Sequence, residues 1–215
     1  MKISPTLTEV KEIAKTGKYD ILPVSCEILS DFITPIEAMR ILQNVSTHCY
    51  LLESAQANEA WGRYTFLGYD PKLEINCIDG HMKLGKLSVE TENPSEYIRQ
   101  ILSEYKSPKF DYLPSFTGGL VGYFSYDYLG YKEKSIRGKA KDTEDFKDVD
   151  LMLFDKVIAF DNLCQKIILI ANMSLDAPET GYNKAIVELK QLRELLMYGE
   201  KKQNMGGKLL GEVTP

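Results

Sequence analysis

The fold is decided around Cys49-Tyr50-Leu51-Leu52-Glu53-Ser54, which is followed nine residues later by Arg63-Tyr64-Thr65-Phe66-Leu67-Gly68. Cys49–Leu52 and Tyr64–Tyr69 have the apolar and β-branched composition of strands. Glu53 and Ser54 place a carboxylate beside a hydroxyl where the first strand ends. Such a pair can hold a small cationic group, such as an ammonium, by charge-assisted hydrogen bonds. It can equally leave the strand and cap the next turn, and the residues alone favour the turn.

Further strands are predicted on both sides of this stretch. Leu73–Ile78 is expected to turn at Asp79-Gly80 into Met82–Leu84, and Val157–Phe160 to pair with Lys166–Ala171 through Asp161-Asn162. A strand in two parts, Ile21–Val24 and Glu27–Leu29, is expected to be interrupted near Pro23. Gly118-Gly119-Leu120-Val121-Gly122 lacks the Lys-Ser/Thr of a phosphate-binding loop, so its glycines indicate a strand that approaches its neighbour closely.

Four helices are predicted from apolar periodicity and from capping signals. They are Leu7–Lys15, a helix from Thr34-Pro35-Ile36-Glu37 to Val45, a helix opened by Asn93-Pro94-Ser95-Glu96 whose apolar stripe reaches Tyr105, and a helix capped by Asp176-Ala177-Pro178-Glu179 whose stripe is Tyr182, Ile186, Leu189, Leu192 and Leu196. Because these helices are separated by groups of strands with hairpin turns, the sequence predicts an α+β fold with layered helices over largely antiparallel β-sheets.

Composition narrows the class of protein. The chain has 215 residues, 44% hydrophobic and 27% charged, with a net charge of −5 and no basic tract, so nucleic acid is not an expected partner. The N-terminus lacks the apolar core of a signal peptide, and the longest apolar runs are strand-sized, which predicts no membrane partner and a cytoplasmic location. The four cysteines and two histidines are not at metal-ligand spacing, so no metal site is expected.

No catalytic constellation is apparent. Acid–base chemistry needs two groups that converge in a cleft, whereas Glu90/Glu92 and Asp142/Glu144/Asp145 lie in polar, loop-like sequence. Catalytic residues are therefore predicted to be absent from this chain. Arg63 is the strongly placed cation near Glu53, and either an ion pair between them or a shared ligand role fits the sequence.

Five stretches in order resemble the N-terminal region of anthranilate synthase component I, the chorismate-using large subunit of the first committed step in tryptophan synthesis. They are Leu22-Pro23-Val24 with Asp31 to Pro35, Leu51-Leu52-Glu53-Ser54, Gly62 to Gly68, Phe116 to Phe124 with Tyr126-Asp127, and Asp155 to Asn172. Component I of aminodeoxychorismate synthase shares much of this pattern, but the Leu-Leu-Glu-Ser form looks more like the anthranilate branch.

The resemblance implies a regulatory role. In that family this motif forms part of the L-tryptophan site for feedback inhibition, so Glu53 and Ser54 would contact the effector's amino acid group, Leu51 and Leu52 would line the site, and Arg63 and Tyr64 would flank it. The parent enzyme would convert chorismate to anthranilate and pyruvate with magnesium, using ammonia from a glutamine amidotransferase partner, component II. No cofactor is implied for this chain itself.

The resemblance also predicts the domain organisation. Residues 1–197 would be the N-terminal regulatory domain, and residues 198–215 a linker toward a C-terminal chorismate-binding domain that this chain lacks. The chain alone is therefore expected to be inactive, and exposed sheet surface would favour homo-oligomers. Two alternatives remain: the corresponding domain of the aminodeoxychorismate branch, and a free-standing amino-acid-binding or interaction module.

Overall fold

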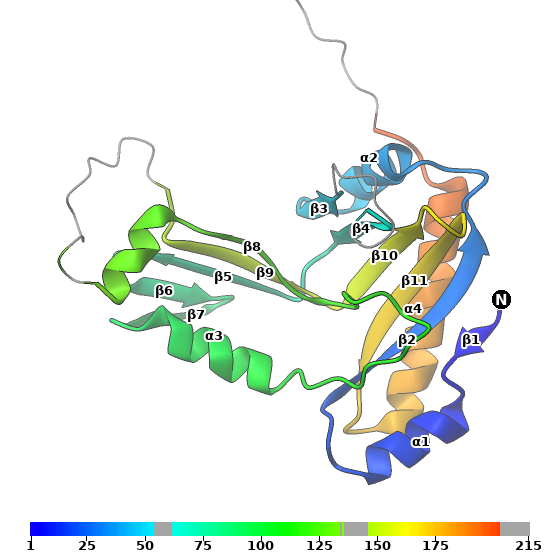
Figure 1. Ribbon diagram of the computed structural model, residues 1–215, viewed down its shortest axis with the longest axis horizontal. Coiled ribbons are helices and arrows are strands. Elements are labelled where there is room, and N and C mark those ends of the chain that lie inside the picture. Colours follow the sequence, from blue (N-terminus) through cyan, green and yellow to red (C-terminus); the bar gives the residue numbers. More distant parts are fainter. Residues whose placement is uncertain (54–61, 134, 136–145, 203–215) are drawn as a thin grey trace, which may run out of the picture.

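The protein is built from two antiparallel sheets that extend in different directions, with helices packed on each (Figure 1). The computed structural model describes residues 1–53, 62–133, 135 and 146–202. The α+β class is confirmed, and the helices and sheets lie in layers.

Each sheet is formed by strands that pair as antiparallel neighbours. The six-stranded sheet has the order β1 (Ile3–Ser4), β2 (Ile21–Leu29), β11 (Lys166–Ser174), β10 (Lys156–Asp161), β4 (Tyr64–Tyr69), β3 (Cys49–Leu52). The five-stranded sheet has the order β7 (Leu87–Glu90), β6 (His81–Leu84), β5 (Leu73–Ile78), β9 (Val149–Phe154), β8 (Gly119–Phe124). Both predicted hairpins are present, and the β5–β6 turn has positive φ at Asp79 and Gly80, as a tight hairpin turn requires.

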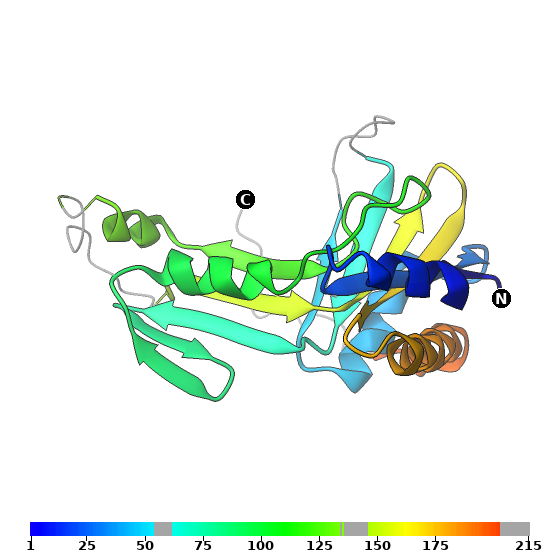
Figure 2. The same cartoon turned by 90° about the horizontal axis from the view of Figure 1, so that it is seen from below.

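The helices are α1 (Leu7–Lys15), α2 (Pro35–Val45), α3 (Pro94–Ser103) and α4 (Pro178–Tyr198), with a 3₁₀ turn at Tyr126–Tyr131. Helices α1, α2 and α4 form the main core with one face of the six-stranded sheet. Its other face is covered around Leu113 and Phe116, which belong to the segment between α3 and β8. Helix α3 lies along the five-stranded sheet (Figure 2).

The expected break near Pro23 is wrong, because β2 is continuous from Ile21 to Leu29. Pro23 lies opposite Asn172 of β11, and the N–H of Asn172 bonds to Asp155 on the other side, at 2.8 Å. Pro23 therefore occupies a non-hydrogen-bonded pair, and its nitrogen faces the outer side of β2. Strand β1 pairs only with Ser25 and Cys26, so no ladder bond is lost.

The start of α4 and the end of α3 also differ from prediction. Helix α4 begins after Ala177, with no side-chain cap, because the carboxylate of Asp176 instead accepts from the Ser174 hydroxyl at 2.7 Å. Helix α3 ends at Ser103, so Tyr105 lies beyond it. The predicted stripe of α4 is buried at Tyr182, Leu189, Leu192 and Leu196.

The glycine-rich stretch is a strand, as predicted. Gly122 has φ +153°, and a Cβ placed there would lie 2.0 Å from the carbonyl oxygen of Asp150 on β9. Only glycine allows this approach between the strands.

Candidate functional site

The predicted ligand-binding residues lie at one edge of the six-stranded sheet. Strand β3 is the edge strand, and Leu51 faces Leu67 of β4 in the core that the helices cover. Leu52 lies opposite Phe66 and is 47% exposed. Glu53 follows β3 directly and is exposed. Ser54 lies outside the described residues, so its predicted role stays a prediction.

Glu53 is tied to the neighbouring strand through Thr65. The Thr65 hydroxyl donates to Glu53 Oε1 at 3.4 Å, and Asn162 Nδ2 donates to the same hydroxyl oxygen at 3.3 Å. Thr65 is fully buried, so its hydroxyl is positioned by the sheet. The long Thr65–Glu53 contact is weak. The carboxylate therefore keeps acceptor capacity for another donor.

Arg63 forms its ion pair with Asp161. Its Nε and Nη2 donate to the two carboxylate oxygens of Asp161 at 3.0 and 2.7 Å, in the bidentate geometry that suits a guanidinium. Asp161 is 3% exposed and also accepts from the backbone N–H groups of Leu163 and Cys164. The Arg63 guanidinium, helped by the Cys164 N–H, holds the pKa of the Asp161 carboxyl below its usual range despite burial.

Tyr64 stands beside this ion pair. The guanidinium carbon of Arg63 lies 4.9 Å from the centre of the Tyr64 ring, within cation–π range. The ring also packs against Phe66, which contacts Phe116 from the covering segment. Burial raises the pKa of the Tyr64 hydroxyl. Tyr64 thus joins the charged hairpin end to an aromatic surface.

The site therefore combines the exposed carboxylate of Glu53, the adjoining half-exposed Leu52 and Arg63, whose guanidinium is held by an ion pair. Such a set can accept an ammonium at Glu53 and place an apolar group against Leu52. Sequence analysis missed Thr65, Asp161 and Asn162 as parts of this arrangement. The sequence indicated Asp161-Asn162 only as the connection between two strands.

Comparison with known proteins gives consistent results. The chain is 34% identical over 198 residues to anthranilate synthase component 1 of Acetivibrio thermocellus and 36% identical over 196 residues to that of Pseudomonas aeruginosa. These alignments cover 89% and 87% of this chain and 39% of each relative. The chain is related to the N-terminal region of anthranilate synthase component 1. It spans about two fifths of the length of these relatives.

A solved structure agrees with this relationship. Anthranilate synthase component I from Streptococcus pneumoniae matches 77% of this chain and 36% of its own, with a TM-score of 0.50 and 25% sequence identity. The chain is also 34% identical over 183 residues to the chloroplastic anthranilate synthase alpha subunit 2 of Oryza sativa subsp. japonica, an alignment that covers 77% of this chain and 30% of that protein. No protein-family model matches the sequence.

The described residues show neither a metal-binding cluster nor a membrane-spanning helix. Within the described ranges, no group of three or more His, Cys, Asp or Glu side chains is arranged to hold a metal ion. None of the described helices is both long and apolar enough to cross a bilayer.

Proposed function

We propose that this chain is the regulatory N-terminal region of an anthranilate synthase component 1, and that the end of β3 forms one wall of an L-tryptophan feedback site. The observation that carries the proposal is 34–36% identity to component 1 proteins over 87–89% of the chain. The parent protein would convert chorismate and ammonia to anthranilate and pyruvate. A glutamine amidotransferase partner would supply the ammonia in the cytoplasm.

The geometry at β3 supports the proposed effector role. The Glu53 carboxylate is exposed and its contact with Thr65 is weak, so it can accept the ammonium of an amino acid. Leu52, which is half exposed, would provide apolar surface for the indole, with Ser54 as a further acceptor, while Leu51 on the opposite face of β3 packs against the core. Arg63 would act through position rather than contact, since Asp161 already binds its guanidinium in bidentate geometry.

Magnesium is proposed for the parent protein only. The described part of this chain offers no cluster of carboxylates that fits such an ion, so no step in this chain is assigned to it. Catalysis would then depend on residues of the parent protein that lie outside this chain. In this proposal the chain supplies regulation and a scaffold.

An assay for anthranilate tests the enzymatic part. The 215-residue chain, given chorismate, ammonium and magnesium, is expected to produce no anthranilate fluorescence. Steady turnover by this chain alone would refute the assignment of catalysis to other residues. Extension of the reading frame beyond codon 215 into a chorismate-binding region would support the parent protein, and a stop codon there would favour a free-standing module.

Feedback inhibition tests the site. In the complete parent enzyme, Glu53→Gln is expected to raise the L-tryptophan concentration for half inhibition by about tenfold, because a charge-assisted hydrogen bond becomes a neutral one. The control is Glu179→Gln, which removes an exposed carboxylate of α4 that pairs with Lys11 of α1. It should leave inhibition unchanged. Unchanged inhibition in the Glu53 variant would remove this carboxylate from the site.

The isolated chain separates the alternatives further. Calorimetry with L-tryptophan should show weak binding or none, because only one wall of the site is present. Micromolar binding would instead support a self-sufficient amino-acid sensor. We also expect self-association, since Tyr123 and Phe124 of edge strand β8 are exposed. A monomer in sedimentation at high concentration would contradict that expectation.

A further inference from the structure

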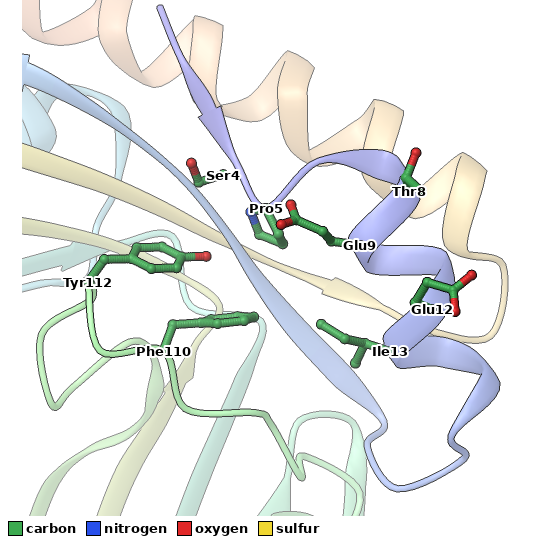
Figure 3. A pocket seen from close by; sticks show the side chains of 8 residues that line it. All are labelled: Ser4, Pro5, Thr8, Glu9, Glu12, Ile13, Phe110 and Tyr112. Carbon is green, nitrogen blue, oxygen red and sulfur yellow. The ribbon is translucent and has the colours of Figure 1, made fainter.

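A hollow lies beside α1, near the edge of the six-stranded sheet opposite to β3. It has a volume of about 410 Å³ and lies between α1 and the segment that leads from α3 to β8 (Figure 3). Its lining includes Ser4, Pro5, Glu9, Ile13, Phe110 and Tyr112. Hollows of this size suit small organic molecules.

One wall is aromatic. The rings of Phe110 and Tyr112 are stacked, with centres 5.1 Å apart and planes 24° apart. Both side chains extend toward α1, where Pro5 and Ile13 face them (Figure 3). Tyr112 is 47% exposed, so apolar ring surface remains open to a ligand. This wall favours a flat apolar group or a cation placed over a ring.

The opposite wall carries a fixed carboxylate. Oε2 of Glu9 accepts from the backbone N–H and the hydroxyl of Thr6, at 2.7 and 2.8 Å, in the capping box of α1. These hydrogen bonds lower the pKa of Glu9, so the group is ionised at neutral pH. The box fixes the carboxylate beside Pro5 at the rim of the hollow.

The charge of Glu9 reaches the aromatic wall. Burial, and then the negative charge of Glu9, raise the pKa of the Tyr112 hydroxyl to about 12. Glu12, one turn further along α1, adds a second carboxylate, which Lys15 partly offsets through an exposed pair at 2.8 Å. The hollow therefore has a negative rim and an apolar, aromatic interior.

We propose that this hollow is a binding site for a small organic cation: an ammonium or guanidinium attached to a flat apolar group. The cationic head would lie at Glu9, and the apolar part would pack against Phe110 and Tyr112. This proposal does not depend on the function proposed for the β3 edge.

The molecule contains a matched control for the carboxylate. Helix α2 begins with the same capping box, in which the Glu37 carboxylate accepts from the backbone and hydroxyl of Thr34. Glu37 is not among the residues that line the α1 hollow. Since glutamine can replace glutamate in a capping box, Glu9→Gln and Glu37→Gln should both fold, although Glu37→Gln also removes the ion pair with Lys201.

The test titrates the 215-residue chain with phenethylamine, phenethyl alcohol and phenylacetate, followed by protein NMR chemical shifts. Phenethylamine should bind with a dissociation constant in the millimolar range or tighter, and shift resonances of α1 and of residues near Tyr112. The neutral alcohol and the anion should each bind at least about tenfold more weakly. Equal binding of the amine and the alcohol, or no shifts with about 10 mM amine, would overturn the proposal.

The variants locate the site. Glu9→Gln should weaken amine binding about fivefold, and Phe110→Leu about threefold, through lost charge and lost ring surface respectively. Glu37→Gln should leave amine binding unchanged. If Glu9→Gln binds the amine as well as the unaltered protein does, the carboxylate has no role and the proposal fails.

Discussion

The two sheets are buried to different degrees, although both are antiparallel and are joined by short connections. The six-stranded sheet is covered on one face by α1, α2 and α4 and on the other by the segment around Leu113 and Phe116. The five-stranded sheet packs against α3, while its edge strand β8 leaves Tyr123 and Phe124 exposed. Burial of apolar area drives folding, so the six-stranded sheet should dominate stability and the five-stranded sheet should be the weaker unit.

The largest effect should come from a cavity in the doubly covered sheet. Leu169 of β11 is fully buried in the main core, so Leu169→Ala should lower the free energy of unfolding by about 3 to 4 kcal/mol. Ile98→Ala, in α3 over the other sheet, should cost about 2 kcal/mol, because its surroundings can collapse more easily. Urea unfolding measures both.

An exposed position serves as the control for these truncations. Leu163→Ala, in the turn between β10 and β11, should change stability by less than about 0.5 kcal/mol. If Ile98→Ala proved as costly as Leu169→Ala, the two sheets would be equally important to the core, and the proposed difference between them would be wrong.

A backbone clash should disrupt the weaker sheet selectively. Gly122→Ala would bring Cβ within 2.0 Å of the Asp150 oxygen and 2.8 Å of the Leu151 Cα, and neither backbone atom can move alone. We expect a loss of about 2 to 3 kcal/mol and faster amide exchange in β8 and β9, with β10 and β11 still protected.

Gly17→Ala measures the cost of backbone strain without the steric clash that is expected at Gly122. Gly17 also has positive φ, at +61°, but no atom lies within 4 Å of its added Cβ. Its cost should be about 1 kcal/mol, from backbone strain alone. Equal costs for the two variants would show that the contact between β8 and β9 is not tight.

Local sequence signals predicted much of this fold. The strands Cys49–Leu52, Tyr64–Tyr69 and Leu73–Ile78 were predicted with the observed bounds, because turn residues and apolar runs coincide there. Strands β1, β7 and β9 were not predicted: β1 and β7 are short edge strands that carry little pattern, and β9 showed only a short apolar run beside a highly charged stretch. The break predicted at Pro23 was wrong because a proline interrupts a strand only where its nitrogen faces a hydrogen-bonded neighbour. The pairing of β2 with β11 decides which way that nitrogen faces.

The candidate sites show the same limit. Glu53 and Arg63 were identified from their positions near strand ends, but the partner of Arg63 is Asp161, 98 residues away. The hollow beside α1 combines Glu9 with Phe110 and Tyr112, which no local pattern links. Contacts between distant segments depend on the tertiary packing, so a single sequence does not reveal them.

The ion pair at the end of β10 should give the next largest effect. Asp161→Asn removes the charge that Arg63 binds at 2.7 and 3.0 Å, at a site that is 3% exposed. We expect a loss of about 2 kcal/mol at pH 7, because the guanidinium is left without its counter-charge. Glu27→Gln, which breaks the exposed pair with Lys166, should cost less than about 0.5 kcal/mol.

The effect of Asp161 should depend on pH. Its folded-state pKa is lowered, so its contribution is present above the unfolded aspartate value of about 3.9 and is lost as pH falls through the folded value. The stability difference between Asp161→Asn and the unaltered protein should therefore shrink below about pH 4. A difference that stayed constant from pH 7 to pH 2 would mean that the carboxylate charge is not what stabilises the hairpin.

The smallest effect should come from the loss of one hydroxyl group beside the five-stranded sheet. The Tyr131 hydroxyl donates to Asp148 Oδ2 at 2.6 Å and accepts from the Gly80 N–H at 2.7 Å, which ties the 3₁₀ turn to the β5–β6 hairpin. Tyr131→Phe should cost about 1 kcal/mol and speed exchange of the Gly80 amide. The matched control is Tyr126→Phe, since Tyr126 is 80% exposed. It should change neither the free energy of unfolding nor the exchange rate of the Gly80 amide. Because this hairpin belongs to the weaker sheet, the Gly80 amide should exchange through local opening. If it exchanged only on global unfolding, the two sheets would open as one unit.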